Sequence, residues 1–286
     1  MRDQADSLRQ LVKQRVTPAP RTIAVTSGKG GVGKTNMSVN LALCLVQMGK
    51  RVALLDADLG LANADIVLGV YPDFNLGHVL RGEKAIEEII LEGPLGLQVL
   101  GGGSGVYDLA NINEWHLERF IRSMEHLDRE IDFLIIDTGA GIHRNVLSFV
   151  LAVEEVIVVT TPEPTSITDA YGMIKTIIQK NPHSQITVLV NMVQTPKEGE
   201  LVWEKLNTVV QEFLNKELIY GGYVLNDVNV AKSVRDQQPF ILAYPVCSAT
   251  RSIERVAHSM LGIEKILPKR GIRNLFSKMY NLTTPN

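Results

Sequence analysis

The sequence is poor in cysteine and in long apolar runs, and each shortage excludes a class of protein. Cys44 and Cys247 are the only cysteines in 286 residues and lie far apart, which excludes a disulfide scaffold. With six scattered histidines they form no zinc-binding spacing. The longest apolar runs fall far short of the roughly 18 residues that a membrane span needs. Because the chain starts Met-Arg-Asp-Gln, without an apolar signal core, we expect a cytoplasmic protein.

An excess of positive charge is also absent. The formal net charge is −2, so no overall attraction to a phosphate backbone exists and no nucleic-acid partner is expected. The chain is 45% apolar, which excludes a disordered protein because enough apolar surface exists to offset the entropy of ordering. Its length suits one large α/β domain or two small ones.

Short β-branched runs alternate with helical patterns along most of the chain, an arrangement typical of a parallel sheet covered on both faces. We therefore predict an α/β fold with a mostly parallel sheet of about seven or eight strands. The expected strands are residues 22–26, 51–56, 97–101, 132–137, 155–160, 185–191 and 219–225. We divide the whole chain into three segments: an N-terminal segment with a proline-containing linker over 1–20, a main domain over 21–265 and a C-terminal amphipathic helix over 266–286.

A glycine-rich loop follows the first expected strand and matches the phosphate-binding pattern GxxxxGKT. Its backbone N–H groups would turn toward phosphate oxygens, the lysine before its threonine would reach the β/γ-phosphates, and the threonine hydroxyl would hold Mg²⁺. The expected nucleotide-binding residues here are Gly28, Lys29, Gly30, Gly31, Val32, Gly33, Lys34, Thr35 and Asn36.

The same glycines also satisfy GxGxxG, the dinucleotide-binding pattern, with Asp56 near the position of a ribose-binding acid. Lys34 and Thr35 favour a nucleoside triphosphatase, because a dinucleotide site needs neither. The apolar strand that ends in Asp137 agrees, since a carboxylate there steadies Mg²⁺ through water.

Lys29, a second lysine inside the loop, makes this form resemble the deviant Walker A signature of the MinD/ParA family. Residues 56–65 and 137–141 are similar to that family's two switch segments, and the resemblance covers about residues 21–261. It implies an ATPase that uses ATP and Mg²⁺ and closes into a homodimer, in which Lys29 reaches the partner's phosphates. By the same resemblance Asp58 positions the attacking water, while Asp56 and Asp137 join Thr35 around Mg²⁺.

Other residues also match positions of the family, but each has an alternative explanation that the sequence leaves open. Glu163, in Thr161-Pro-Glu-Pro164, matches a contact to the partner subunit or its nucleotide, and Asn191 matches the adenine-reading position. Pro239 and Phe240 would lie beside the base. A turn and a C-capping amide explain these residues nearly as well. Asn36 and Met192 depart from the family pattern.

The C-terminal segment carries an apolar stripe about 120° wide at helical spacing, flanked by basic residues, which is the pattern of an interfacial membrane helix. It consists of Ile272, Leu275, Phe276, Met279 and Leu282. The expected partner is anionic lipid of the inner membrane, with reversible attachment. The alternative is a helix packed on its own domain, and the two can be two states of one switch.

The N-terminus decides which member of the family is closest. Asp3, Gln4, Ala5, Leu8 and Arg9 resemble the DQAxxLR motif that precedes the ATPase domain in FlhG-type ATPases. This group controls flagellar number and placement. The resemblance implies stimulation of an FlhF-type GTPase and contact with flagellar switch-ring (C-ring) proteins. A MinD-type division-site ATPase, a ParA-type DNA-partition ATPase and a metal-cluster or biosynthetic carrier are the alternatives.

Overall fold

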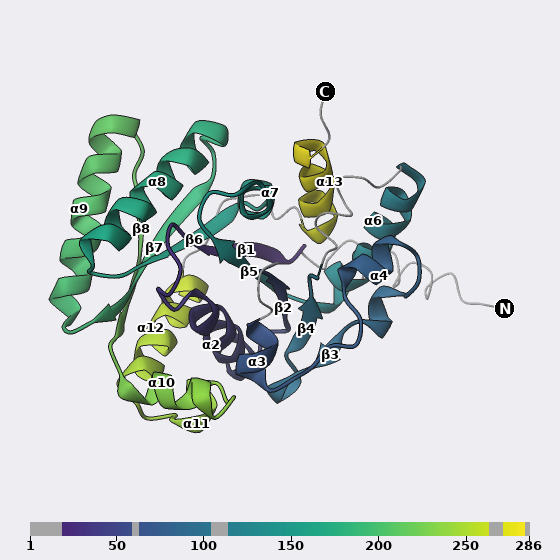
Figure 1. The fold of residues 1–286 in the computed structure, drawn as a ribbon, viewed down its shortest axis with the longest axis horizontal. Coiled ribbons are helices and arrows are strands. Elements are labelled where there is room, and N and C mark those ends of the chain that lie inside the picture. The colour runs from purple at the N-terminus through teal and green to yellow at the C-terminus, as the bar shows by residue number, and fades with distance from the viewer. Residues whose placement is uncertain (1–18, 59–62, 104–113, 263–270, 284–286) are drawn as a thin grey trace, which may run out of the picture.

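One mixed sheet runs through the centre of the molecule (Figure 1). The computed structural model describes residues 19–58, 63–103, 114–262 and 271–283, and the sheet that these residues form has eight strands in the order β3-β4-β2-β5-β1-β6-β7-β8. All neighbours are parallel except β3 and β4. The strands are β1 (Arg21–Ser27), β2 (Val52–Ala57), β3 (Leu91–Glu92), β4 (Gln98–Gly101), β5 (Phe133–Ala140), β6 (Glu155–Thr160), β7 (Gln185–Val193) and β8 (Ile219–Leu225).

Helices cover both faces of this sheet, which confirms the predicted fold class. One face carries α2 (Lys34–Gln47), α3 (Ala64–Leu68), α10 (Val228–Arg235), α11 (Phe240–Ala243) and α12 (Ser248–Gly262). The other carries α4 (Leu76–Leu80), α6 (Glu114–Glu130), α7 (Arg144–Ala152), α8 (Pro164–Lys180), α9 (Pro196–Leu214) and α13 (Gly271–Thr283). Two 3-10 turns, Ile86–Glu88 and Pro94–Gly96, flank the antiparallel edge.

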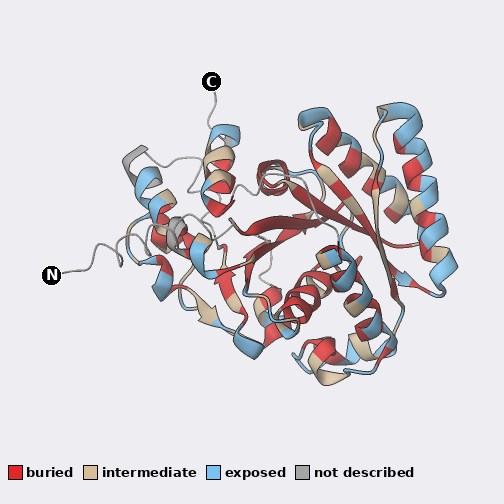
Figure 2. Cartoon of the chain, turned by 180° about the vertical axis from the view of Figure 1, so that it is seen from behind, coloured by how far each residue is buried: buried red, intermediate tan, exposed pale blue. Residues whose placement is uncertain are grey.

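The central strands are buried (Figure 2). Their successive residues supply the two cores in turn. Ala24 belongs to the core under α7 and α8, whereas its neighbours Ile23 and Val25 belong to the core under α2 and α12. This alternation follows from the pleat, which points adjacent side chains to opposite faces. Continuous apolar runs in the sequence are therefore what a sheet with helices on both faces requires.

Local signals account for where the helices begin. The Thr195 hydroxyl accepts a hydrogen bond from the Glu198 N–H at the start of α9, and the Asp227 carboxylate caps α10 in the same way. Proline at the first position starts both α8 and α9, because its missing N–H has no partner there in any case. Each of the seven expected strands matches an observed one to within three residues, and only the two-residue β3 was missed.

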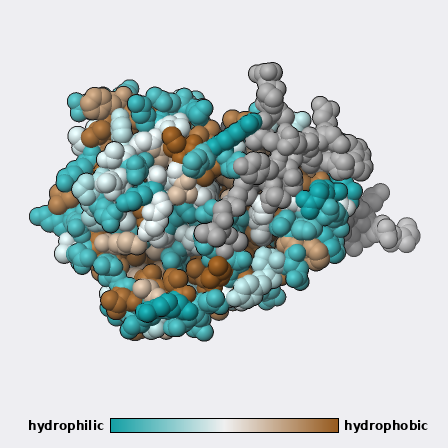
Figure 3. Space-filling view, viewed as in Figure 1, coloured by the Kyte–Doolittle hydropathy of each residue, from teal (hydrophilic) through white to brown (hydrophobic). Residues whose placement is uncertain are grey.

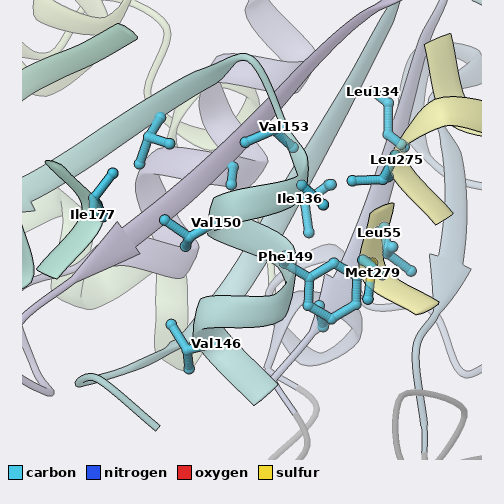
Figure 4. Close-up of a cluster of buried hydrophobic side chains, with 14 of the residues drawn as sticks. Leu55, Leu134, Ile136, Val146, Phe149, Val150, Val153, Ile177, Leu275 and Met279 are labelled. Atoms are coloured by element: carbon cyan, nitrogen blue, oxygen red, sulfur yellow. The ribbon is translucent and has the colours of Figure 1, made fainter. Parts of the chain in front are cut away.

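The C-terminal helix α13 is docked on the domain rather than separate from it. Ile272, Leu275, Phe276 and Met279 are buried against α6, α7 and the sheet, and only Leu282 of the stripe is exposed. Leu275 and Met279 lie beside side chains of the central strands and α7 (Figure 4). The stripe predicted to face a membrane thus faces protein in this conformation, which is the alternative that the sequence allowed.

Polar contacts hold the docked helix at its start and near its middle. The N–H of Ile272 donates to Asp128 of α6 at 2.7 Å, and Lys278 donates to the carbonyl oxygen of Ala152 at 3.3 Å. Lys278 also lies 3.8 Å from the Glu154 carboxylate. Among the described residues, no helix combines the length and the apolar character needed to cross a bilayer.

Truncating Phe276 tests this docking. Its ring meets Phe120 edge-on with centroids 4.8 Å apart, and it is only 1% exposed. We expect Phe276→Ala to lower the free energy of unfolding by about 3–5 kcal/mol, measured by urea denaturation, because a large cavity opens between α13 and α6. Leu282→Ala, at a 46% exposed position on the same helix, should cost less than about 0.5 kcal/mol. Equal, small effects at both positions would show that α13 is not docked.

Candidate functional site

The predicted catalytic and binding residues gather where the parallel strands end. The glycine-rich loop connects β1 to α2, Asp56 lies near the end of β2 with Asp58 just after it, and Asp137 lies in β5. These strands are neighbours in the sheet, and Asp56 pairs in register with Asp137. Ligands of open α/β sheets bind at this edge, so the topology itself assembles the site.

Glycine is required in the loop at two positions for different reasons. Gly33 has φ +85 and forms the N-cap of α2, a left-handed conformation that other residues adopt only at a cost. At Gly28 a side chain would lie 2.1 Å from the backbone oxygen of Asp169 in α8. The loop therefore packs directly on the α8 backbone, and its amides open at the N-terminus of α2, where an anion is favoured.

Lys34 is a buried cation with few partners. It is 8% exposed, and within the described chain its ammonium has one recorded partner, Asp137 Oδ1, at 3.6 Å. That separation exceeds hydrogen-bond distance, so its three N–H donors have no acceptor recorded among the described residues. A buried, poorly satisfied cation beside open loop amides is the arrangement that a phosphate group completes.

Asp137, the ion-pair partner of Lys34, is fully buried. Asp137 accepts a hydrogen bond from the Ser38 hydroxyl at 2.9 Å through Oδ1, whereas its Oδ2 is buried without a hydrogen-bond partner in the described residues. Burial raises the pKa of Asp137, and the charge of Lys34 with the hydroxyls of Thr35 and Ser38 opposes that shift. An added cation near Oδ2 would stabilise the charged form further.

In this structure both oxygens of the Asp56 carboxylate accept hydrogen bonds from backbone N–H groups, so Asp56 is not an open metal ligand. Its Oδ1 accepts the N–H of Asp58, and its Oδ2 accepts the N–H groups of Asn63 and Ala64 at the start of α3, all at 3.0 Å. The carboxylate therefore ties both ends of the segment between β2 and α3. Burial and the neighbouring Asp137 charge raise the pKa of Asp56 to about 6, although the backbone hydrogen bonds oppose this.

These residues fit Mg²⁺ only as an ion that takes most ligands from phosphate and water. In the part of the chain that the structure describes, no three His, Cys, Asp or Glu side chains form a metal cluster. Thr35 lines the cavity and Asp137 keeps an unpaired buried oxygen, so these two would hold the ion, directly and through water. Asp56, with both oxygens engaged, would act by placing the Asp58 segment.

Asp58 lies at the mouth of the site, where it lines the cavity. A methyl group added to Gly139, near the end of β5, would lie 3.3 Å from Asp58 Oδ1. The two segments predicted to be switches therefore touch through this carboxylate and a glycine. Residues 59–62, inside the first of them, lie outside the described residues.

The side chain of Lys29 has different partners from that of Lys34, the other lysine of the loop. Its Nζ lies 3.0 Å from Glu163 Oε2 and 3.0 Å from the Thr165 hydroxyl, both at the start of α8. The pair is open to solvent, with side chains 39% and 68% exposed, so its net stabilisation is small. Lys29 is thus held on its own subunit by contacts that are easily exchanged.

A cavity of about 780 Å³ extends from the loop past Asn191 to α10. Asn191 is 5% exposed, and its Nδ2 donates to the Val32 carbonyl oxygen at 2.8 Å. Pro239 and Phe240, predicted to lie beside the base, do not line this cavity, and the Phe240 side chain is fully buried in the core under α2 and α12. The reason is that α11 turns inward, where the Ile241 N–H donates to Asn40.

Several residues at the site carried no sequence signal. Thr165 contacts Lys29, Ser38 contacts Asp137, and α10 forms a cavity wall, yet none belongs to a recognised motif. Only the helical spacing from Lys34 to Ser38, one turn apart, indicated that Ser38 faces the same way. Asp3, Gln4, Ala5, Leu8 and Arg9 lie outside the described residues.

A phosphate loop at the carboxyl edge of a parallel sheet, with two buried strand-end carboxylates, defines a P-loop nucleotide-binding domain. Residues 23–240 match the family model described as the CobQ/CobB/MinD/ParA nucleotide binding domain. The chain is 41% identical to antiactivator FleN of Pseudomonas aeruginosa over 240 residues, covering 84% of this chain and 86% of that protein. It is 37% identical to the flagellum site-determining protein YlxH of Helicobacter pylori over 263 residues, covering 90% and 88%.

Among solved structures, the septum site-determining protein MinD of Pyrococcus horikoshii, complexed with Mg-ADP, superposes with a TM-score of 0.67. That match covers 87% of this chain and all of the other at 24% identity, and it concerns the fold. The chain belongs to the MinD/ParA family of ATPases and, within it, to the FlhG-type flagellar group that includes FleN and YlxH.

The raised pKa of Asp56 predicts a pH dependence of stability. Because its pKa is about 6 in the folded chain and near 4 when unfolded, the folded state binds the proton more tightly between these values. Raising the pH through this window therefore lowers stability, by about 2 kcal/mol from pH 4.5 to 7 for this group. Urea unfolding of the nucleotide-free protein at both pH values should show a smaller decline for Asp56→Asn. Glu204→Gln, at an exposed position, controls for net charge, and identical declines in wild type and Asp56→Asn would contradict the assignment.

Proposed function

We propose that the chain is an ATP-dependent dimerisation switch that controls flagellar number and placement. One observation carries the proposal: the phosphate loop holds two lysines with different partners. Lys34 is buried beside Asp137, whereas Lys29 lies at the surface on an exposed ion pair. A loop needs one lysine for its own phosphates, so the second is available for the site of a neighbouring subunit.

In the proposed dimer each Lys29 leaves Glu163 and Thr165 and reaches the phosphates bound by the other subunit. A cation supplied from a partner stabilises the charge that develops on the transferred phosphoryl group, as an arginine finger does. Hydrolysis then depends on association. Asp58 orients the water that attacks the γ-phosphorus, the bond to the β-phosphate oxygen breaks, and ADP and phosphate form.

Mg²⁺ and ATP or ADP are the proposed ligands. The P. horikoshii relative was crystallised with Mg-ADP, and the residues around Thr35 and Asp137 fit an ion held by phosphate and water. When bound, the ion would neutralise phosphate charge. Lys34 contributes its unsatisfied N–H donors, and the amides of the glycine-rich loop contribute the remainder of the cradle.

Membrane attachment is proposed to compete with the docking of α13. The buried stripe of α13 would recover about the same transfer free energy in lipid as on the domain, since both surroundings are apolar. The balance between the docked and the membrane-bound state of α13 is therefore set by the other contacts, which differ between the two states. Docking has the contacts to Asp128 and Glu154 and keeps Phe120 and Phe149 covered, whereas an anionic membrane adds about 1 kcal/mol for each basic residue such as Arg273 and Lys278.

Two helices on one dimer bind far better than one, because the second attaches at high effective concentration. ATP binding would thereby favour the membrane over docking. The proposed organisation is a stimulating segment over residues 1–20, an ATPase domain over 21–265 and a reversible membrane helix over 266–286.

The flagellar partners are proposed from the N-terminal motif and from the names of the relatives. Gln4 and Arg9 supply an amide and a guanidinium, which can order a water or stabilise phosphoryl charge in an FlhF-type GTPase. Switch-ring proteins of the flagellar C-ring are the proposed partners of the dimer. FleN and YlxH, named as an antiactivator and a site-determining protein, support the flagellar context.

Removing the charge at position 29 tests the dimer. We expect Lys29→Ala to bind ATP within about threefold of wild type, because Lys34 and the loop amides remain, but to stay monomeric. Hydrolysis should fall by about 10³-fold. Analytical gel filtration with ATP against ADP measures the association, and phosphate release measures turnover.

Lys180→Ala, an exposed lysine at the end of α8, is the matched control and should dimerise and hydrolyse ATP normally. If Lys29→Ala associates and hydrolyses ATP as wild type does, the chain is an ordinary monomeric nucleotide binder and the proposal fails.

Weakening the docked state should strengthen membrane binding. Asp128→Asn removes the charge that caps α13 without touching its apolar stripe, so more protein should sediment with anionic vesicles at a given ATP concentration. Truncation after Pro268 should abolish sedimentation. Glu118→Gln, on the exposed side of α6, is the control and should match wild type. Persistent binding of the truncated chain would rule out the helix as the anchor.

A further inference from the structure

The cavity that starts at the phosphate loop extends to α10. Val230, Ala231, Val234 and Arg235 of α10 line it there, together with Met192. Apolar side chains gather on the surface over α10 and α3 (Figure 3), including Val228 and Ile66, which are 74% and 40% exposed. A flat aromatic group fits this end of the cavity better than a charged one.

Asn191 lies beside the phosphate loop, where a side chain added at Gly33 would meet its Nδ2 at 2.4 Å. Its Nδ2 is committed to the Val32 carbonyl oxygen, and its Oδ1 makes no hydrogen bond within the described residues. The free oxygen can accept a hydrogen bond from an exocyclic amine, which adenine has and guanine lacks at that position. Met192 follows in a left-handed conformation, φ +59, with its side chain 41% exposed. It supplies an apolar, polarisable contact but no charge.

Arg235 is the cation at this end of the cavity. It is exposed, and its one recorded hydrogen bond in the described structure runs from Nε to the Ala231 carbonyl oxygen at 3.3 Å. Its terminal nitrogens therefore have no ion-pair partner there. The turn that follows is held against the end of α3, because the Tyr71 hydroxyl donates to Gln237 Oε1 at 3.1 Å.

We infer that Arg235 is a base-contacting residue whose guanidinium stacks on the adenine ring of the bound nucleotide. A planar guanidinium over an aromatic face gains from the ring quadrupole and from contact area. Met192 adds an apolar contact, and Asn191 accepts from the exocyclic amine. This inference rests on the proposed ATP site and names the residue that holds its base.

The test compares Arg235→Gln with Lys232→Gln, a variant of an exposed lysine on the same helix that does not line the cavity. Isothermal titration with ADP, adenosine monophosphate and inorganic triphosphate separates base from phosphate contacts. For Arg235→Gln we expect roughly 3- to 30-fold weaker binding of both adenine nucleotides and unchanged binding of triphosphate. Lys232→Gln should match wild type for all three, and unchanged melting temperatures establish that both variants are folded.

Unchanged ADP affinity in Arg235→Gln would overturn the inference. An equal loss for triphosphate would also overturn it, because Arg235 would then act as a phosphate-binding charge. Lys34→Ala separates this from the underlying proposal: it should abolish binding of ADP and of triphosphate, whose terminal phosphates Lys34 reaches, and if it does not, the nucleotide site itself is wrong. A failure at Arg235 alone leaves the ATP site intact.

Discussion

The buried pair of Lys34 and Asp137 is the interaction on which the rest of the site depends. Both charges are withdrawn from water, yet they are 3.6 Å apart and one Asp137 oxygen has no partner in the described structure. Burying two charges is unfavourable unless other groups satisfy them. The fold maintains this incomplete arrangement because β2, β5 and β1 are adjacent and their strand ends are rigid. A bound phosphate would accept hydrogen bonds from Lys34, and its counter-ion would lie near the unpaired oxygen of Asp137. Both contacts favour ligand binding, because these two groups are buried without full hydrogen bonding in the ligand-free site.

The surroundings of this pair differ in how firmly they are held. Gly28 packs on the α8 backbone and Asp56 ties the segment before α3 through three backbone hydrogen bonds. By contrast, the side-chain partners recorded for Lys29 in the described chain, Glu163 and Thr165, are both solvent-exposed. The loop thus combines well-packed residues with one solvent-exposed charge, which is the combination that the proposed dimer requires.

Much of the fold was predictable because strands buried on both faces must be apolar throughout and must alternate with helices. The phosphate loop was predictable because its chemistry needs glycine, lysine and threonine at set spacing. The placement of Phe240 was not, since a buried aromatic and a base-contacting one have the same local sequence. The docking of α13 was not, because one amphipathic stripe satisfies a protein groove and a membrane equally. Thr165 and Arg235 reach the site only through tertiary packing, which no spacing along the chain encodes.

The apolar stripe of α13 can face either protein or lipid, and this has a functional consequence. Phe276 packs on Phe120, and Leu275 and Met279 lie against the sheet and α7, so release of α13 uncovers apolar surface on the domain as well as on the helix. A single subunit in water gains nothing from release, and the helix stays docked. Only a process that supplies lipid to the helix and joins two helices in one particle can reverse the balance. In the proposed dimer, a nucleotide site completed by a second subunit would be such a process, because it would make the pairing of helices a consequence of ATP binding.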